Sequence, residues 1–305
     1  MKAKEMLENF AAASLAWSEE GLACRYRGMV VFLLWGLTFA PVFPEMVRDY
    51  VANPDNSHGF LVVLIAGYMA WQRKDQIRDV QPYPSNLGLI LLVLSLAFYV
   101  FGLAGGILVI QRYMMVFSFI GLVFYLFGQE IFKVLVFPLF FLLFMVPLPV
   151  SLVGLVAFPL QIMATKTSEI ILQGVGIPVF REGNMLYFLQ TQLEVAEACS
   201  GIRSIMSMIM LSCLFVYFSK GGWLRKAILV LSAIPVAMFA NIVRVSGTGI
   251  LAHFYGGKVA RGFLHEFSGL AVFVLGFALL FMEFRGLEKI GFKRSTKAGM
   301  SDDLQ

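Results

Sequence analysis

Long apolar runs, bounded by charged, glycine or proline residues, recur along the chain from residue 28 to residue 284. Because the hydrocarbon core of a bilayer needs about 20 apolar helical residues to cross it, each run predicts one membrane-spanning helix. We expect about eight spans, near residues 28–44, 58–72, 86–105, 108–127, 131–148, 198–218, 224–245 and 264–284. The predicted fold is an all-α polytopic membrane protein.

One further apolar stretch, residues 150–165, is interpreted differently. It contains Pro159, follows Pro147 and Pro149, and ends at Lys166. Proline removes a backbone donor and breaks the helical ladder. We therefore expect an interfacial or re-entrant segment here rather than a ninth crossing.

The pattern becomes half polar between residues 176 and 198, where glycine, proline and asparagine interrupt it. Residues 185–189 and 193–196 are candidates for short strands or extended chain. We expect them to form a small extracytoplasmic segment between two spans.

This pattern divides the chain into three parts. Residues 1–27 lack the short apolar core of a cleavable signal peptide and are expected to be a cytoplasmic N-terminal segment. Residues 28–285 form the membrane domain. Residues 286–305 are expected to be a basic cytoplasmic tail, disordered from residue 291.

Composition supports the membrane assignment. The mean hydropathy is +0.80, with 59% hydrophobic and 14% charged residues, so the apolar excess must face lipid. The net charge of +5 does not indicate a nucleic-acid partner, because the basic residues are scattered between apolar runs. Basic residues at helix ends act as topology signals and contact anionic lipid.

Lysine and arginine also predict the orientation. With eight spans and the N-terminus inside, 16 of the 24 basic residues fall on the cytoplasmic side, as the positive-inside rule requires. A ninth crossing would move Lys220, Arg225 and Lys226 outside. We therefore expect both termini in the cytoplasm.

Three reactive residues are expected at the outer ends of predicted spans. Cys199 opens the sixth span, Arg244 closes the seventh and His265 opens the eighth. Helix ends on one side of a membrane can converge even when they are far apart in sequence. This expected convergence predicts a catalytic site.

Cys199 is expected to be an unpaired thiol. Cys24 is on the cytoplasmic side, and Cys213 lies about 21 Å further along the same helix, whereas a disulfide needs Cα atoms within about 7 Å. An unpaired cysteine facing an oxidising compartment is a candidate reactive group. The alternative is a small buried hydrophobic residue.

The neighbours of Cys199 favour the reactive interpretation. Polar, small and basic residues are costly at a lipid-facing helix start, and four of them surround it: Glu197, Ser200, Gly201 and Arg203. A helix N-terminus and nearby cations favour the thiolate form. Arg203 is a candidate either for sharing an oxyanion role or for binding an acidic substrate residue.

Arg244 is preceded by Asn241, one turn earlier on the same helix face. A terminal arginine is often a snorkelling anchor. The functional alternative is a guanidinium directed at the oxyanion of a tetrahedral intermediate, where losing one donor typically costs about 3–4 kcal/mol.

The sequence holds three histidines. At the start of the last span, His265 can remove a thiol proton and later protonate a leaving amine. The alternative for His265 and His253 is a polar group at the membrane interface. His58 is expected to be a structural cap or a substrate contact.

Other chemistries fit poorly. The sequence shows no metal-ligand spacing, no phosphate-binding loop or dinucleotide motif, and no pair of aspartates within the predicted spans. We therefore expect neither a metal nor a cofactor.

Several ordered motifs between about residues 55 and 285 resemble the exosortases and the related archaeosortases. The motifs are Ser57-His58-Gly59-Phe60-Leu61, the stretch from Pro138 to Pro149, Arg181-Glu182-Gly183-Asn184, the block from Glu194 to Ser204 around Cys199, Asn241-Ile242-Val243-Arg244-Val245, and His265-x-x-x-Gly269.

The resemblance implies a bacterial sorting enzyme in the inner membrane, with its active site facing the periplasm. Its partners would be exported proteins that carry a C-terminal Pro-Glu-Pro-type motif, a transmembrane helix and a basic cluster, and it would accompany exopolysaccharide production. By motif, Cys199 would be the nucleophile, Arg244 the essential arginine and His265 the third member of the site.

The sequence leaves two other functions open. The chain could be a transporter or a non-enzymatic subunit of an exopolysaccharide export system, although its charges gather at one membrane face rather than at the midplane. It could also be a scaffold in which Cys199 is inert. For an enzyme, the sequence leaves open whether water or another acceptor resolves the thioester.

Overall fold

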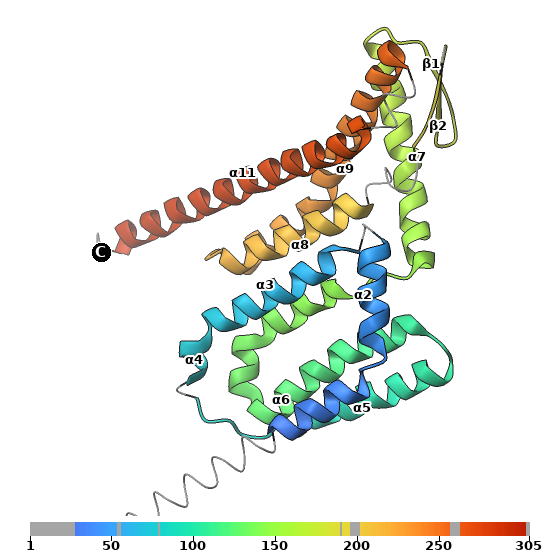
Figure 1. Ribbon diagram of the computed structural model, residues 1–305. Coiled ribbons are helices and arrows are strands. Elements are labelled where there is room, and N and C mark those ends of the chain that lie inside the picture. Colours follow the sequence, from blue (N-terminus) through green and yellow to red (C-terminus); the bar gives the residue numbers. More distant parts are fainter. Residues whose placement is uncertain are drawn as a thin grey trace, which may run out of the picture. The chain divides into compact units, whose positions relative to one another are not determined.

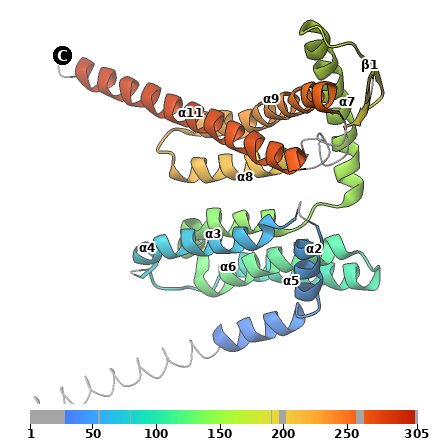
Figure 2. The ribbon, with the colours of Figure 1, turned by 45° about the horizontal axis from the view of Figure 1, so that its top comes forward.

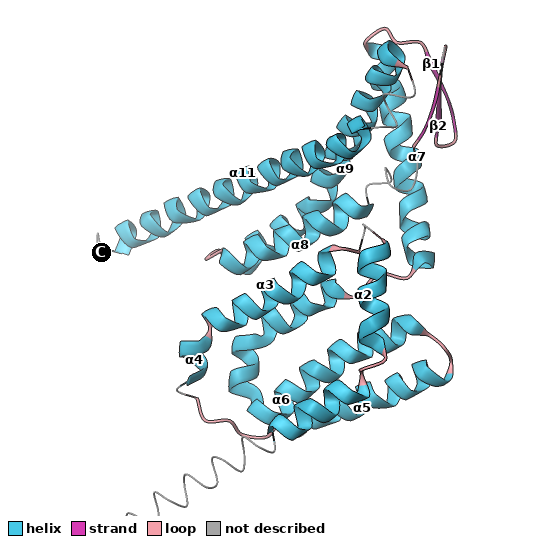
Figure 3. Cartoon of the chain, viewed as in Figure 1, coloured by secondary structure: helices cyan, strands magenta, loops and turns pink. Residues whose placement is uncertain are grey.

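A computed structural model of the chain describes residues 28–53, 56–78, 80–189, 191–195, 202–256 and 263–302. Most of these residues are helical, and they also include one small sheet (Figure 3). The chain divides into two compact units, Met1–Pro147 and Leu148–Gln305. Each unit is described by itself below.

The first unit is helical throughout its described secondary structure. A helix over Gly28–Thr38 is followed, after a bend of 60°, by α2. The labelled elements are α2 (Val42–Ala52), α3 (His58–Gln72), α4 (Lys74–Arg78), α5 (Asn86–Ala104), α6 (Leu108–Phe141) and the short 3₁₀ helix η1 (Leu142–Met145).

Within the first unit, α6 reverses the direction of the chain. Arg112, near its start, forms an ion pair with Asp49 of α2, and the Tyr50 hydroxyl donates a 2.6 Å hydrogen bond to the carbonyl of Met145. A straight helix would separate Arg112 and Met145 by about 50 Å. The bend is at Gly128, whose φ of 79° and ψ of −176° are not helical. The predicted division between residues 108–127 and 131–148 is confirmed at this bend.

Glycines bring α5 and α6 into backbone contact. A Cβ atom at Gly121 would lie 2.6 Å from the backbone nitrogen of Leu92, and one at Gly88 would overlap the backbone of Tyr125. Helices in membranes commonly associate through small residues that permit such close approach.

Among its described residues, the second unit combines four helices with a three-stranded sheet (Figure 1). Its elements are α7 (Val150–Gly174), β1 (Val179–Glu182), β2 (Met185–Phe188), β3 (Gln192–Glu194), α8 (Ile202–Phe218), α9 (Trp223–Tyr255) and α11 (Phe263–Asp302). The antiparallel strands follow the order β1-β2-β3. Gly183, with a φ of 59°, allows the two-residue turn between β1 and β2.

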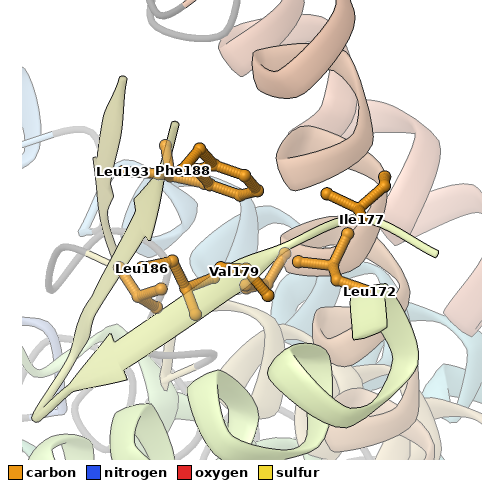
Figure 4. Close-up of a cluster of buried hydrophobic side chains, with 8 residues drawn as sticks. Leu172, Ile177, Val179, Leu186, Phe188 and Leu193 are labelled. Carbon is orange, nitrogen blue, oxygen red and sulfur yellow. The ribbon is translucent and has the colours of Figure 1, made fainter. Parts of the chain in front are cut away.

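One face of the sheet packs on α7 and α9. Its core contains Leu172, Ile177, Val179, Leu186, Phe188, Leu193, Val195 and Val245, and Figure 4 shows the sheet residues directed toward Leu172 and Ile177. Polar contacts reinforce the attachment to α7. Gln173 Nε2 donates to the Val179 carbonyl, and Arg181 pairs with Glu169 at 3.2 Å. The strands predicted near residues 185–189 and 193–196 are confirmed, and β1 is an addition.

Helices α8, α9 and α11 pack on one another in this unit (Figure 2). Their core includes Met208, Phe215, Leu229, Ala233, Ala237 and Leu280. Ser219, just after α8, donates a 2.6 Å hydrogen bond to Glu288 of α11. Arg244 of α9 lies against Gly269 of α11, so α9 and α11 run antiparallel.

Five described helices are long and apolar enough to cross a membrane, or six if the bent pair at residues 28–52 counts as one span. They are Asn86–Ala104, Leu108–Met145, Val153–Gly174, Trp223–Tyr255 and Gly269–Lys289. The expectation of a polytopic, mainly helical membrane protein is confirmed. Two of the eight predicted spans, α3 and α8, are shorter apolar helices.

The expected helix break at Pro159 is wrong, because α7 is continuous from Val150 to Gly174. Proline removes one helical hydrogen bond, but neighbouring helices commonly compensate for this loss in membrane proteins. Here α7 packs along α9 and buries Ala157, Ala164 and Leu172.

Two helix ends also differ from prediction. The seventh predicted span stops at residue 245, whereas α9 continues to Tyr255 because Val245 and Ile250 pack on the sheet core. We expected a disordered tail from residue 291, whereas α11 remains helical to Asp302. A hydrophobic pattern marks where a helix leaves an apolar environment, not where its backbone hydrogen bonding ends.

Candidate active site

Two antiparallel helices, α9 and α11, determine the position of the Arg244 side chain. It lies on α9 and is partly buried. A Cβ atom at Gly269 of α11 would lie 3.7 Å from Arg244 Nη2 and 3.9 Å from its Cζ. The guanidinium therefore rests against a helix surface that carries no side chain. Arg244 also lies about 16 Å before the end of α9, so the expectation that it closes this helix is wrong.

His265 belongs to the first turn of α11, and its backbone is described while its side chain is not. It precedes Gly269 by four residues, which places the two on one helix face, about 6 Å apart along the axis. Gly269, against which the Arg244 guanidinium lies, is therefore about one turn of α11 after His265.

Asn241, one turn before Arg244, is only 3% exposed. The neighbouring helix α7 carries a buried polar row at Gln161, Thr165 and Ser168. The Thr165 hydroxyl donates to the Gln161 carbonyl at 2.6 Å, and Ser168 lies 3.5 Å from the carbonyl of Ile242. This polar surface faces the part of α9 that carries Asn241 and Arg244.

Sequence reasoning missed this row on α7. The three polar residues of the row are four and three positions apart, a spacing that puts their side chains on one helix face. This spacing was the signal in the sequence that could have indicated a helix here. The expectation of an interfacial or re-entrant segment at residues 150–165 hid that periodicity.

Glu197, Cys199 and Ser200 lie outside the described residues. Arg203 lies in the first turn of α8, where only the backbone is described. The described chain stops at Val195 and resumes at Ile202.

The chain leading to Cys199 is fixed at Val195. Its backbone N–H donates to the Asn184 carbonyl at 2.9 Å, and Asn184 Nδ2 donates to the Val195 carbonyl at 3.3 Å. Val195 is 1% exposed. The chain is therefore anchored on the sheet four residues before Cys199.

The other two histidines lie elsewhere. His253 is near the end of α9, with its ring 6.5 Å from that of Phe188, which fits a polar group at the edge of the sheet core. His58 is the first residue of α3 and is partly buried in the first unit. The following Gly59 packs so closely on Tyr50 that a Cβ atom would overlap the ring.

An ion pair in the first unit was also missed. Arg112 Nη1 lies 2.7 Å from Asp49 Oδ2, and the arginine side chain is 8% exposed. A single arginine inside the apolar run at residues 108–127 was the available signal, since intramembrane charges are usually paired. Asp49 lies beyond the predicted end of its span, at residue 44, so the sequence pattern did not indicate it as the partner.

Comparison with known proteins identifies the family. A family model described as "Transmembrane exosortase (Exosortase_EpsH)" matches residues 50–282, more than three quarters of the chain. The chain belongs to the transmembrane exosortase family. No curated protein and no solved structure matches it.

As an exosortase-family member, the protein is a multi-pass membrane protein. The matched range contains Cys199, Arg244 and His265. Family membership implies a protease that sorts proteins carrying PEP-CTERM signals. The resemblance drawn from the motifs is therefore confirmed at the level of the family.

Proposed function

We propose that this exosortase is a membrane-embedded cysteine protease or transpeptidase that cleaves C-terminal sorting signals through a thioester. One observation carries the proposal. The Arg244 guanidinium lies against Gly269, one turn from His265. This pairing supports a site built from α9, α11 and the segment that carries Cys199.

The proposed reaction is acyl transfer. The Cys199 thiolate attacks the scissile carbonyl carbon, and the Arg244 guanidinium stabilises the resulting oxyanion. The tetrahedral intermediate collapses to a thioester while His265 donates a proton to the departing amine. His265, now neutral, takes a proton from an incoming amine or water, which attacks the thioester and releases the thiolate.

The supporting residues have separate proposed roles. Asn241 is buried one helical turn before Arg244, and we assign it to holding the guanidinium in place. Glu197, Ser200 and Arg203 flank the nucleophile in sequence, and we assign Arg203 to the acidic residue of the substrate motif. For His58, at the start of α3, the two proposals made from the sequence are a structural cap or a substrate contact.

We further propose that the site faces the periplasm of a bacterial inner membrane, with both chain termini in the cytoplasm, an arrangement in which α7 does not count as a ninth crossing. The basic residues Lys220, Arg225 and Lys226 gather at the α8–α9 connection, and the positive-inside rule favours the cytoplasm for such a loop. Arg244 and Gly269 lie toward the opposite end of the same helices. The proposed link to exopolysaccharide export rests on the family resemblance.

The test is processing of a co-expressed protein that carries a PEP-CTERM signal, followed by mass spectrometry of its new C-terminus. Cys199→Ala should abolish processing, whereas Cys213→Ala should retain it as the matched cysteine control. Normal processing by Cys199→Ala would refute the proposal. The mass of the product distinguishes hydrolysis from transfer to an acceptor.

The other two roles need matched controls of their own. Arg244→Lys keeps the charge but loses the planar donor pair, so we expect a loss of about a hundredfold or more in processing rate. Arg225→Lys, near the opposite end of α9, is its control. His265→Gln should likewise lose activity, while His253→Gln should process substrate normally.

A further inference from the structure

The strand β3 lies at an edge of the sheet. The order β1-β2-β3 leaves one side of β3 without a neighbouring strand among the described residues. The opposite edge differs, because Gln173 of α7 donates a 3.0 Å hydrogen bond to the Val179 carbonyl of β1. Of the two edges, β3 therefore has the more accessible backbone.

The register shows which backbone groups of β3 point outward. Phe188 N–H donates to the Thr191 carbonyl, and Val195 N–H donates to the Asn184 carbonyl. In an antiparallel pair, residues bonded to the partner strand alternate with residues whose N–H and C=O groups point away. Leu193 therefore faces β2, while Gln192 and Glu194 direct their backbone groups to the open edge.

Those two residues are both exposed, whereas Leu193 between them is buried in the sheet core. The sheet holds β3 in a fixed extended conformation through that buried side chain. The open edge thus offers two donors and two acceptors at the two-residue spacing of a strand. A second extended polypeptide has the same spacing and alternation.

We propose that the segment of the substrate next to its cleavage site binds as a fourth strand along the open edge of β3. This inference rests on the function proposed above. It assigns recognition of the substrate backbone to Gln192 and Glu194, and leaves side-chain recognition to other parts of the site.

Chain continuity supports this assignment. Glu194 is five residues before Cys199, and five extended residues span at most about 18 Å. A peptide that pairs with β3 therefore has its neighbouring residues within reach of the nucleophile. Exposed strand edges commonly bind extended peptides in this way, with main-chain hydrogen bonds supplying the affinity.

Proline substitution tests the edge directly. Gln192→Pro and Glu194→Pro each remove one outward N–H without removing a bond to β2, the position at which a strand tolerates proline. Each should lower kcat/KM for a signal-bearing substrate by about fivefold, the loss of one net hydrogen bond. Gln192→Ala and Glu194→Ala keep the N–H and are the references that separate loss of this backbone donor from loss of the side chain. Equal activity of the proline and alanine variants would overturn the proposal.

The substrate offers a complementary test. N-methylation of single backbone amides in a synthetic substrate should reduce cleavage at alternate residues, because only every second amide of the added strand faces β3. An effect without a two-residue period would contradict strand addition.

Crosslinking separates this inference from the proposed chemistry and from misfolding. A photoreactive phenylalanine at Gln192, in a Cys199→Ala background, should crosslink the substrate, whereas the same group at Phe180 of β1 should not. Absence of the Gln192 crosslink would refute strand addition even if Cys199 is the nucleophile. Conversely, if the Gln192 crosslink forms but Cys199→Ala still processes the substrate, strand addition is supported and only the proposed function fails.

Discussion

At Gly269 the absence of a side chain lets the Arg244 guanidinium lie against the backbone of α11. The motif pattern had singled out both Arg244 and the spacing His265-x-x-x-Gly269. The motif pattern alone did not explain why residue 269 is a glycine. The structure supplies one, because Gly269 forms the surface on which the guanidinium rests.

Enlarging residue 269 should therefore displace Arg244. A Cβ atom would be in ordinary contact at 3.7 Å from Nη2, so we expect Gly269→Ala to retain most processing activity. Gly269→Leu should lose about a hundredfold in rate, since displacements of about 1 Å in an active site have effects of this size. Processing rates of the two variants check the prediction, and equal rates would contradict it.

The Asp49–Arg112 ion pair allows a prediction of stability. Asp49→Ala leaves the arginine, whose side chain is 8% exposed, without its carboxylate. Because Asp49 itself is 39% exposed, we expect a discounted loss of about 2 kcal/mol in the free energy of unfolding.

Thermal unfolding in detergent measures that loss. The exposed pair Glu130–Lys133, at 2.9 Å with side chains 69% and 59% exposed, provides the control. Lys133→Ala should change stability by less than about 0.5 kcal/mol. Similar losses in the two variants would argue against a special role for the buried pair.

Between elements, close packing depends on particular glycines. The sequence predicted α5 and both parts of α6, but it did not indicate that Gly88 and Gly121 meet the opposing backbone. Glycine is common in membrane helices for several reasons. Which glycines lie in an interface is decided only when the helices pack.

Gly121→Val should therefore destabilise the first unit by about 1–3 kcal/mol, because its Cβ atom would lie 2.6 Å from a backbone nitrogen of α5. Gly67 of α3 is the matched control, since a Cβ atom there meets nothing within 4 Å. Thermal unfolding of Gly121→Val and Gly67→Val should separate the two. Equal destabilisation would mean that helix propensity, rather than packing, dominates.

For the whole molecule, the distribution of basic residues and the antiparallel helices of the second unit together predict sidedness. Ser219 meets Glu288 at one end of these helices, while Arg244 meets Gly269 toward the other. The sheet packs on α9 from Val245 onward. The α8–α9 connection and the sheet should therefore lie on opposite sides of the membrane.

Single-cysteine labelling checks this arrangement. In a chain without other cysteines, Leu189→Cys, at a position 81% exposed beside β2, should react with a membrane-impermeant maleimide added from the periplasmic side. Lys220→Cys should react only after the membrane is permeabilised. Labelling of both positions from the same side would contradict the proposed topology.

The sequence by itself determined the membrane class, most helices, the second and third strands and the family, because these depend on local hydrophobicity, turn residues and ordered motifs. Tertiary structure decided the continuity of α7 through Pro159, the extension of α9 to Tyr255 and the contact between Arg244 and Gly269. Each of these depends on packing between segments distant in sequence. Burial against a neighbouring element can outweigh a local helix-breaking signal, and no local pattern records which element that neighbour will be.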